Sequence, residues 1–96
     1  MKWGYIIVFD DALGTRKEIQ NFLDTRPEIL NWYACMSNAI FMVSEKTAEG
    51  LQKIVSEFNT GKNASFIILD VKTDKNGWLP RKAWDFMNNP KAVWEK

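Results

Sequence analysis

The chain contains no histidine, a single cysteine (Cys35) and no apolar run long enough to cross a membrane. Without histidine, Cys–His and Ser–His catalysis, histidine metal sites and imidazole pH switching are excluded. A single cysteine forms no disulfide within the chain, and its neighbours Ala34 and Met36 favour a small buried thiol over a nucleophile. Because Met1 and Lys2 lead directly into a predicted strand, we expect no signal peptide, a cytoplasmic location and no membrane partner.

An excess of charge of one sign is also missing. The formal net charge is +1, which provides no electrostatic signature of DNA or RNA binding. Residues 1–74 carry 8 basic and 10 acidic side chains, whereas residues 75–96 carry 5 and 2. A mildly basic tail of this kind is more often a solvated surface than a phosphate site.

The composition is that of a folded domain. The 96 residues are 46% apolar and 14% aromatic, which is enough for one hydrophobic core. We therefore predict a single domain over residues 1–96, with a core over 1–74 and a Trp-rich helical tail over 75–96. The chain has five Trp residues, a type that is common at interfaces, so we expect some of them at a surface that another group covers.

Local patterns predict four strands and three helices. The strands, rich in β-branched and aromatic residues, are predicted at residues 3–9, 31–36, 39–44 and 65–71. Thr15 and Glu18 match a capping box at the start of the first helix, and Thr47 is the predicted cap of the second. Pro80 suits the first position of the third helix, because its missing N–H would be unpaired there.

The order of these elements is strand, helix, strand, strand, helix, strand and helical tail. This order is typical of an α+β, ferredoxin-like split βαββαβ sandwich. Right-handed crossovers then predict an antiparallel sheet with the strand order 4-1-3-2 and two helices on one face. The other face must be solvated, covered by the tail or paired with a second chain.

Alternation along the strands predicts which side chains lie on that other, open face. Asp70 suggests that its side of the fourth strand faces away from the helices, which leaves Ile67, Leu69 and Val71 facing the helices. In the first strand the same assignment turns Ile6 and Val8 towards the helices. It leaves three large side chains, Tyr5, Ile7 and Phe9, on the open face.

An open face of this kind is too apolar to remain in water and is typical of an interface. The available covers are a tail docked by Trp78 and Trp84, or a second subunit in a homodimer, or both.

The acidic pair Asp10 and Asp11 follows the first strand directly, and the predicted hairpin turn Ser37-Asn38 lies at the same end of the sheet. Oxygen ligands gathered in this way could hold Mg²⁺, which needs one or two carboxylates plus water and phosphate. The favoured alternative is that Asp10 or Asp11 organises the following loop through an Asx turn. Asp70 is expected at the opposite end of the sheet, so one monomer would offer at most a thin metal site.

Two further segments suggest contacts with nucleic acid or a partner. Phe41 lies on a predicted central strand, where RNA-recognition modules stack bases, although core or dimer packing is the favoured reading. Arg81 and Lys82 fall in the first turn of the third helix, beside Trp78, and could contact phosphate. Cations at a helix N-terminus oppose the helix dipole, but a docked tail with solvated charges is the favoured reading.

Three features together resemble the small ferredoxin-like superfamily that includes the CRISPR-associated adaptation nuclease-like subunit and virulence-associated protein D. They are the apolar first strand ending in Asp10, the hairpin over residues 36–43, and a fourth strand followed by a C-terminal appendage. The resemblance implies a homodimer, and in some members a metal-dependent nuclease with Asp10 as the ligand. Other members serve as assembly subunits, and residues 12–18 carry fewer basic side chains than the nucleases usually show.

The sequence is therefore compatible with three functions. The first is a homodimeric, non-enzymatic subunit, without a cofactor, that associates with nucleic acid or with a nucleic-acid-processing complex. The second is a Mg²⁺-dependent nuclease that uses Asp10. The third is a protein-interaction factor or inhibitor that does not bind nucleic acid.

Overall fold

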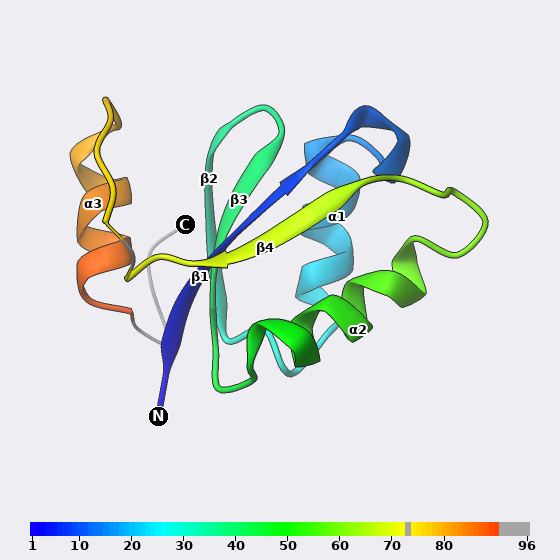
Figure 1. Cartoon of the computed structure of the whole chain (residues 1–96), viewed down its shortest axis with the longest axis horizontal. Helices are drawn as coiled ribbons and strands as arrows, with labels where there is room; N and C mark the ends of the chain where they lie inside the picture. The colour runs from blue at the N-terminus through cyan, green and yellow to red at the C-terminus, as the bar shows by residue number, and fades with distance from the viewer. Residues whose placement is uncertain (73, 91–96) are drawn as a thin grey trace.

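The computed structural model describes residues 1–72 and 74–90, which form an α+β fold (Figure 1). The elements follow in the order β1 (Trp3–Phe9), η1 (Asp11–Leu13), α1 (Arg16–Asp24), β2 (Asn31–Met36), β3 (Ala39–Ser44), α2 (Ala48–Phe58), β4 (Phe66–Asp70) and α3 (Arg81–Asn88). The four strands and α1–α3 lie close to their predicted positions, and η1 is a short 3-10 helix that was not predicted. The predicted tail beyond residue 90 lies outside the described residues.

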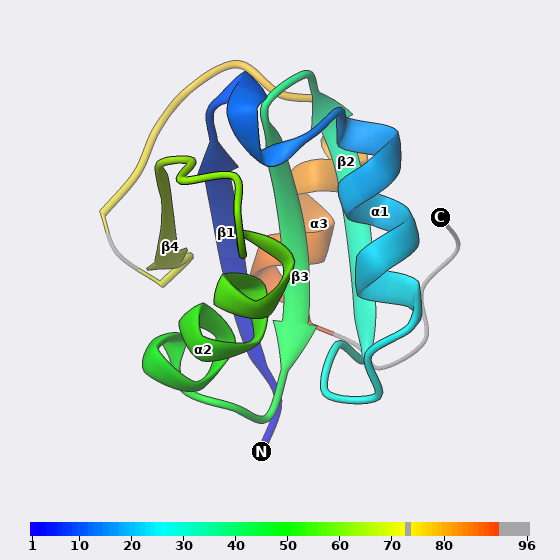
Figure 2. The same ribbon diagram turned by 90° about the vertical axis from the view of Figure 1, so that its right-hand side faces the viewer.

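The four strands form one sheet in the order β2-β3-β1-β4, with every neighbouring pair antiparallel. This is the predicted order 4-1-3-2 counted from the opposite edge, and it fits a ferredoxin-like fold. The two central strands are β1 and β3, while β2 and β4 form the two edges (Figure 2). The hairpin between β2 and β3 turns at Ser37-Asn38, which sets the two strands side by side.

Helices α1 and α2 begin at side-chain caps and cover the same face of the sheet. The capping box is present in α1: the Glu18 amide donates to Thr15 Oγ1 at 3.1 Å, and the Thr15 amide donates to Glu18 Oε1 at 2.8 Å. In α2 the Gly50 amide donates to Thr47 Oγ1 at 3.1 Å. Among residues 1–72 and 74–90, no helix has the length and apolar character that crossing a membrane requires.

The main core lies between these two helices and the sheet. Both helices bury apolar residues at helical spacing, η1 adds Leu13, and the loop before β2 adds Ile29. The buried residues that α1 and α2 contribute are Ile19, Leu23, Leu51, Ile54 and Val55.

The prediction of which side chains in β1 and β4 face the helices was wrong. Tyr5, Ile7 and Phe9 lie in the main core beneath α1 and α2, and none of them is more than 6% exposed. Asp70 was a poor guide because it lies at the end of β4, where a carboxylate is exposed on either face. The side chains of Ile67 and Leu69 therefore point to the open face.

The phenol of Tyr5 shows how the core ends in a polar contact. Its hydroxyl donates to the Lys46 carbonyl at 2.8 Å, while the ring stays in the core. Burial raises the pKa of Tyr5, and the negative charge of Asp70 raises it further.

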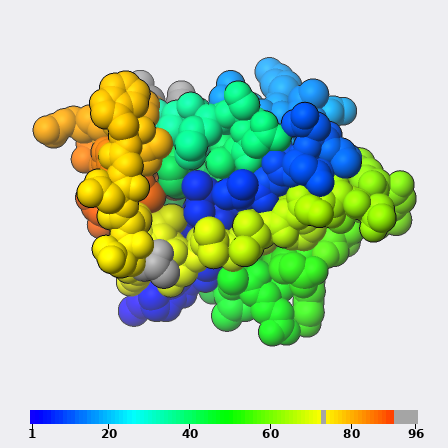
Figure 3. Space-filling view, turned by 45° about the horizontal axis from the view of Figure 1, so that its top comes forward, coloured from blue at the N-terminus to red at the C-terminus, as the bar shows by residue number. Residues whose placement is uncertain are grey.

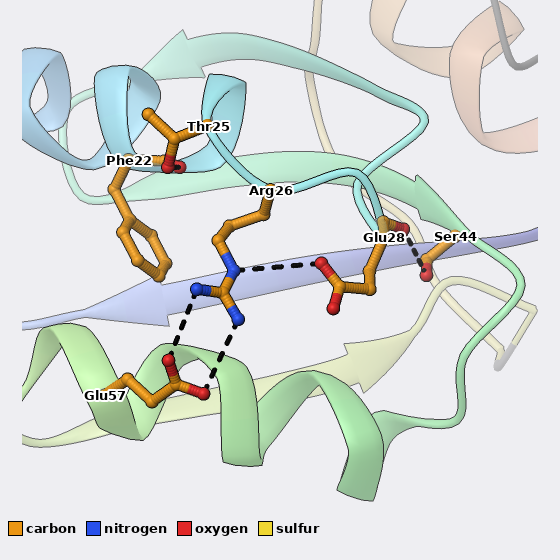
Figure 4. A network of polar contacts seen from close by, with 6 residues as sticks. All are labelled: Phe22, Thr25, Arg26, Glu28, Ser44 and Glu57. Atoms are coloured by element: carbon orange, nitrogen blue, oxygen red, sulfur yellow. Dashed lines mark hydrogen bonds and ion pairs between the residues drawn. The ribbon is translucent and has the colours of Figure 1, made fainter.

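A polar network ties the end of α1 to α2 (Figure 4). The guanidinium of Arg26 donates through two nitrogens to the carboxylate of Glu57, at 3.2 and 3.5 Å. Its Nε lies 3.7 Å from Glu28 Oε1 in an ion pair. Ser44 Oγ donates to the Glu28 carbonyl at 2.7 Å, so the same cluster holds the end of β3.

Candidate functional site

Helix α3 covers one half of the open face. It packs over β1, β2 and β3, on the side of the sheet opposite α1 and α2 (Figure 2). Its buried residues Ala83, Phe86 and Met87 meet Phe41 and Val43 of β3 in a second core cluster. The molecule therefore has three layers, with the sheet in the middle.

The other half of the open face, over β1 and β4, is uncovered in the part of the chain that the structure describes. Val8, Ile67 and Leu69 are 39%, 54% and 45% exposed there, although all three are large apolar residues. Trp78, in the segment before α3, is 92% exposed. We call these four residues the open patch; the segment that carries Trp78 stands beside β4 in Figure 3.

A groove of about 420 Å³ lies between this segment and the sheet. Its lining is mostly apolar and includes Ile6, Phe41, Leu69, Trp78, Leu79 and Trp84. Asp70, Lys75 and Asn76 supply the polar part of the lining. A concave apolar surface with a few polar groups is typical of a binding site.

Trp84 and Trp78 have different surroundings, although both were predicted to dock the tail. Trp84 is half-buried and packs against the second core cluster, as does Leu79. Trp78 extends into solvent instead. Docking of α3 therefore depends on Trp84 and on the buried Phe86, and Trp78 takes no part in it.

Asp10 organises the turn after β1. Its Oδ1 accepts from the Ala12 amide at 3.0 Å, which is the Asx-type cap of η1. Its Oδ2 accepts from the Ser65 amide at 3.1 Å, just before β4. Both carboxylate oxygens of Asp10 thus hold backbone.

Asp11, Ser37 and Asn38 lie at the same end of the sheet as Asp10. The side-chain amide of Asn38 donates to Asp11 Oδ1 at 2.9 Å and to the Phe9 carbonyl at 3.0 Å. Ser37 is exposed in the hairpin turn. The site therefore joins the ends of β1, β3 and β4 through side-chain and backbone hydrogen bonds.

Asp70 lies at the other end of the sheet, where it pairs with Tyr5 across β1 and β4. Within residues 1–72 and 74–90, no group of three or more His, Cys, Asp or Glu residues is placed to hold a metal ion. The carboxylates that do come together, Asp10 and Asp11, could offer Mg²⁺ two protein ligands at most.

Arg81 and Lys82 occupy the first turn of α3 and point to different surroundings. Lys82 Nζ lies 5.4 Å from the centroid of the Tyr33 ring, a cation–π contact with β2. Arg81 is exposed to solvent. Together with Lys75 on the groove, Arg81 places positive charge on both sides of Trp78 along the chain.

Phe41 and Cys35 are both covered by the second core cluster. Phe41 is 2% exposed, and its ring centroid lies 6.3 Å from that of Phe86, so α3 occupies the position that a stacked base would need. Burial raises the pKa of the Cys35 thiol, and the opposing effect of Arg16 is smaller. A raised pKa favours the thiol over the reactive thiolate.

The exposure of Val8, Ile67 and Leu69 was not predicted from the sequence, although Gly4 carries a signal of it. A glycine within a strand often marks a close approach by another segment. A Cβ at position 4 would lie 2.8 Å from Val71 Cγ2 and 3.3 Å from Pro90 Cγ. Gly4 faces the tail, so Ile6 and Val8, which share its side of β1, must face that way as well.

Comparisons of the chain with protein-family models, with curated proteins and with solved structures find no match.

Proposed function

We propose that this protein is a non-enzymatic assembly subunit that binds another protein through the open patch and the groove beside it. The observation that carries the proposal is the exposure of Val8, Ile67 and Leu69 next to the 420 Å³ groove. Large apolar side chains that gather on one surface are typical of interaction sites. Because these side chains are about half exposed, covering each of them would contribute about half of the roughly 1.5–3 kcal/mol that complete burial gives.

The chemistry of this surface favours a protein partner. The lining of the groove is apolar, and its charged residues are of both signs, Asp70 and Lys75. An apolar side chain of a partner can enter such a groove, while Trp78 provides an aromatic anchor at its rim. The net charge of +1 provides little attraction for a polyanion.

A photo-crosslinking experiment tests this proposal in cells that produce the protein. A photoreactive phenylalanine derivative replaces Trp78 in one variant and Lys53, which is exposed on α2, in a matched control. We expect covalent protein adducts from position 78 and far fewer from position 53. Leu69→Lys in the first variant should remove the adducts, because it places a charge on the apolar surface.

Equal adducts from both positions, or adducts that survive Leu69→Lys, would contradict the proposal. Mass spectrometry of the adduct identifies the partner, which is either another protein or a second copy of this chain.

Association with nucleic acid is the second candidate, and the exposed Trp78 between Lys75 and Arg81 is the observation that favours it. Aromatic side chains beside cations bind single strands by stacking and by phosphate contacts. Fluorescence anisotropy with labelled single-stranded RNA and DNA at low salt tests this function. Binding should weaken with added salt and with Trp78→Ala, and a lack of affinity at low salt would favour a purely protein partner.

The nuclease alternative depends on Asp10, whose two oxygens each accept an amide hydrogen bond. Cleavage of RNA or DNA by the parent protein with Mg²⁺, lost in Asp10→Asn, would support it. If the parent protein does not cleave either substrate, this alternative is excluded.

A further inference from the structure

We propose that Asn76 is a site of spontaneous deamidation, the loss of ammonia from its side-chain amide, and that the carboxylate formed there weakens binding at the groove. Asn76 and Gly77 lie in the segment between β4 and α3, and both are exposed. The chemistry needs only the chain itself and water, whereas its effect on binding rests on the proposed function.

Asn76 is the one asparagine in the sequence that a glycine follows. Deamidation begins when the backbone nitrogen of the next residue attacks the side-chain carbonyl carbon of the asparagine. A side chain on that next residue hinders the approach. Gly77 has no Cβ, and glycine has the least restricted backbone of all residues, so the approach at Asn76 is the least hindered in the chain.

The two reacting groups already lie close together. The amide nitrogen of Gly77 donates to Asn76 Oδ1 at 2.8 Å. Because a carbonyl bond is about 1.2 Å long, this nitrogen and Asn76 Cγ are at most about 4 Å apart. Reacting atoms need a separation of about 3–3.5 Å, so a small rotation of the exposed side chain is enough.

The reaction is balanced with water as its only reagent. Hydroxide takes the proton of the Gly77 amide, and the nitrogen bonds to Asn76 Cγ to form a cyclic succinimide. The bond between Cγ and Nδ2 breaks with its electron pair, and Nδ2 takes a proton from water and leaves as ammonia. Water then opens the ring at either carbonyl and leaves an aspartate or an isoaspartate, whose carboxyl group is ionised at neutral pH.

The folded structure holds other asparagine side chains in place. The side-chain amide of Asn38 donates to the Phe9 carbonyl and to Asp11. Asn59 donates to the Ala64 carbonyl and accepts from the Ala64 amide. Neither side chain can turn towards the following amide without losing these hydrogen bonds, so the structure favours reaction at Asn76.

The position of Asn76 links this reaction to the groove. Asn76 and Gly77 are part of its lining, next to Trp78. Deamidation replaces a neutral amide there with a negative charge, and the isoaspartate product also adds a methylene group to the backbone. A charge costs more to remove from water than an amide does. A partner that covers the groove should therefore bind the modified chain less tightly.

Incubation of the purified full chain at pH 8, followed by peptide mapping with mass spectrometry, tests the modification. We expect the peptide that carries Asn76 to gain the mass that accompanies replacement of an amide by a carboxyl group. The peptide with Asn63, which is exposed but followed by Ala64, should stay unmodified over the same time.

Gly77→Ala is the matched control and should slow the reaction by about ten-fold. None of the described residues has an atom within 4 Å of a Cβ at position 77, so this variant should fold as the parent does. The parent chain in urea supplies the rate without a fold, and folded Asn76 should react within about ten-fold of that rate. An Asn76 that stays intact in the folded chain, or a rate that Gly77→Ala leaves unchanged, would overturn the modification site.

The photoreactive variant at position 78 measures the effect on binding. Asn76→Asp introduces the charge of the modified chain, and Asn76→Gln keeps a neutral amide. We expect Asn76→Asp to lower the yield of protein adducts by about ten-fold and Asn76→Gln to leave it unchanged. Equal yields from the two variants would overturn the effect on binding. If position 78 yields no adduct without these changes, the proposed function and the effect on binding both fail, whereas the mass measurement decides the modification separately.

Discussion

At the scale of the residue, Asp10 is the clearest example of a side chain that shapes the backbone. It joins η1 to the start of β4, two segments that are more than fifty positions apart in sequence. Asn38 adds contacts from the hairpin, so the ends of three strands are fixed by short polar side chains.

Replacing Asp10 should therefore reduce stability. We expect Asp10→Ala to lower the free energy of unfolding by about 0.5–2 kcal/mol, the range for loss of an N-terminal cap. Asp10→Asn keeps an acceptor for Ala12 and should lose less. Urea unfolding of the three proteins gives the comparison, and an Asp10→Ala variant as stable as the parent would contradict this role.

Glu18 makes the stability of α1 depend on pH. The amide and hydroxyl of Thr15 stabilise the ionised form and lower the pKa of Glu18 from its ordinary value of 4.5. The unfolded chain then binds more protons than the folded chain as the carboxyl titrates, so this contribution is complete above pH 4.5 and is lost as pH falls through the lower, folded pKa.

The stability difference between the parent and Glu18→Gln should consequently shrink as pH falls from 6 to 3. Urea unfolding at several pH values measures it. In a Thr15→Ala background, which removes the hydroxyl partner, the change with pH should be smaller. A difference that is constant between pH 6 and 3 would refute the assignment.

At the scale of the element, α3 acts as the third layer of the fold. Its buried side chains complete a core cluster with β3, and Val71 and Pro90 lie close to Gly4 of β1. Because α3 reaches only β1, β2 and β3 to any extent, it covers half of the face and leaves the part over β4 apolar and exposed.

Truncation of two aromatic residues of this region should change the stability of the protein by very different amounts. Phe86 is 1% exposed, and Phe86→Ala should destabilise the protein by about 3–5 kcal/mol through loss of burial and a cavity. Trp78→Ala should change stability by less than about 0.5 kcal/mol, because Trp78 is in solvent. Thermal and urea unfolding measure both, and equal effects would show that α3 does not pack as described.

At the scale of the whole molecule, the two faces of the sheet have different roles. The face under α1 and α2 holds the larger core and the Arg26 network, which link segments distant in sequence (Figure 4). The other face is divided between α3 and the open patch.

The elements and the sheet order could be predicted because their signals are local. Thr15 and Thr47 cap the helices where expected, and the Ser37-Asn38 turn forces β2 and β3 to pair. The facing of β1 could not be read from alternation, because Ile6 and Val8 are as apolar as Ile7 and Phe9. Asp70, the one polar marker used, lies at a strand end that is exposed on either face.

The sequence by itself determined the elements, their order, the antiparallel topology and the absence of histidine chemistry. Only the tertiary structure decided that Val8, Ile67 and Leu69 are exposed and that both oxygens of Asp10 hold backbone. The reason is physical: caps and turns depend on neighbouring residues, whereas the burial of a strand face depends on where distant helices pack. Here α3 is too short to cover both halves of the open face, and no local pattern encodes which half it takes.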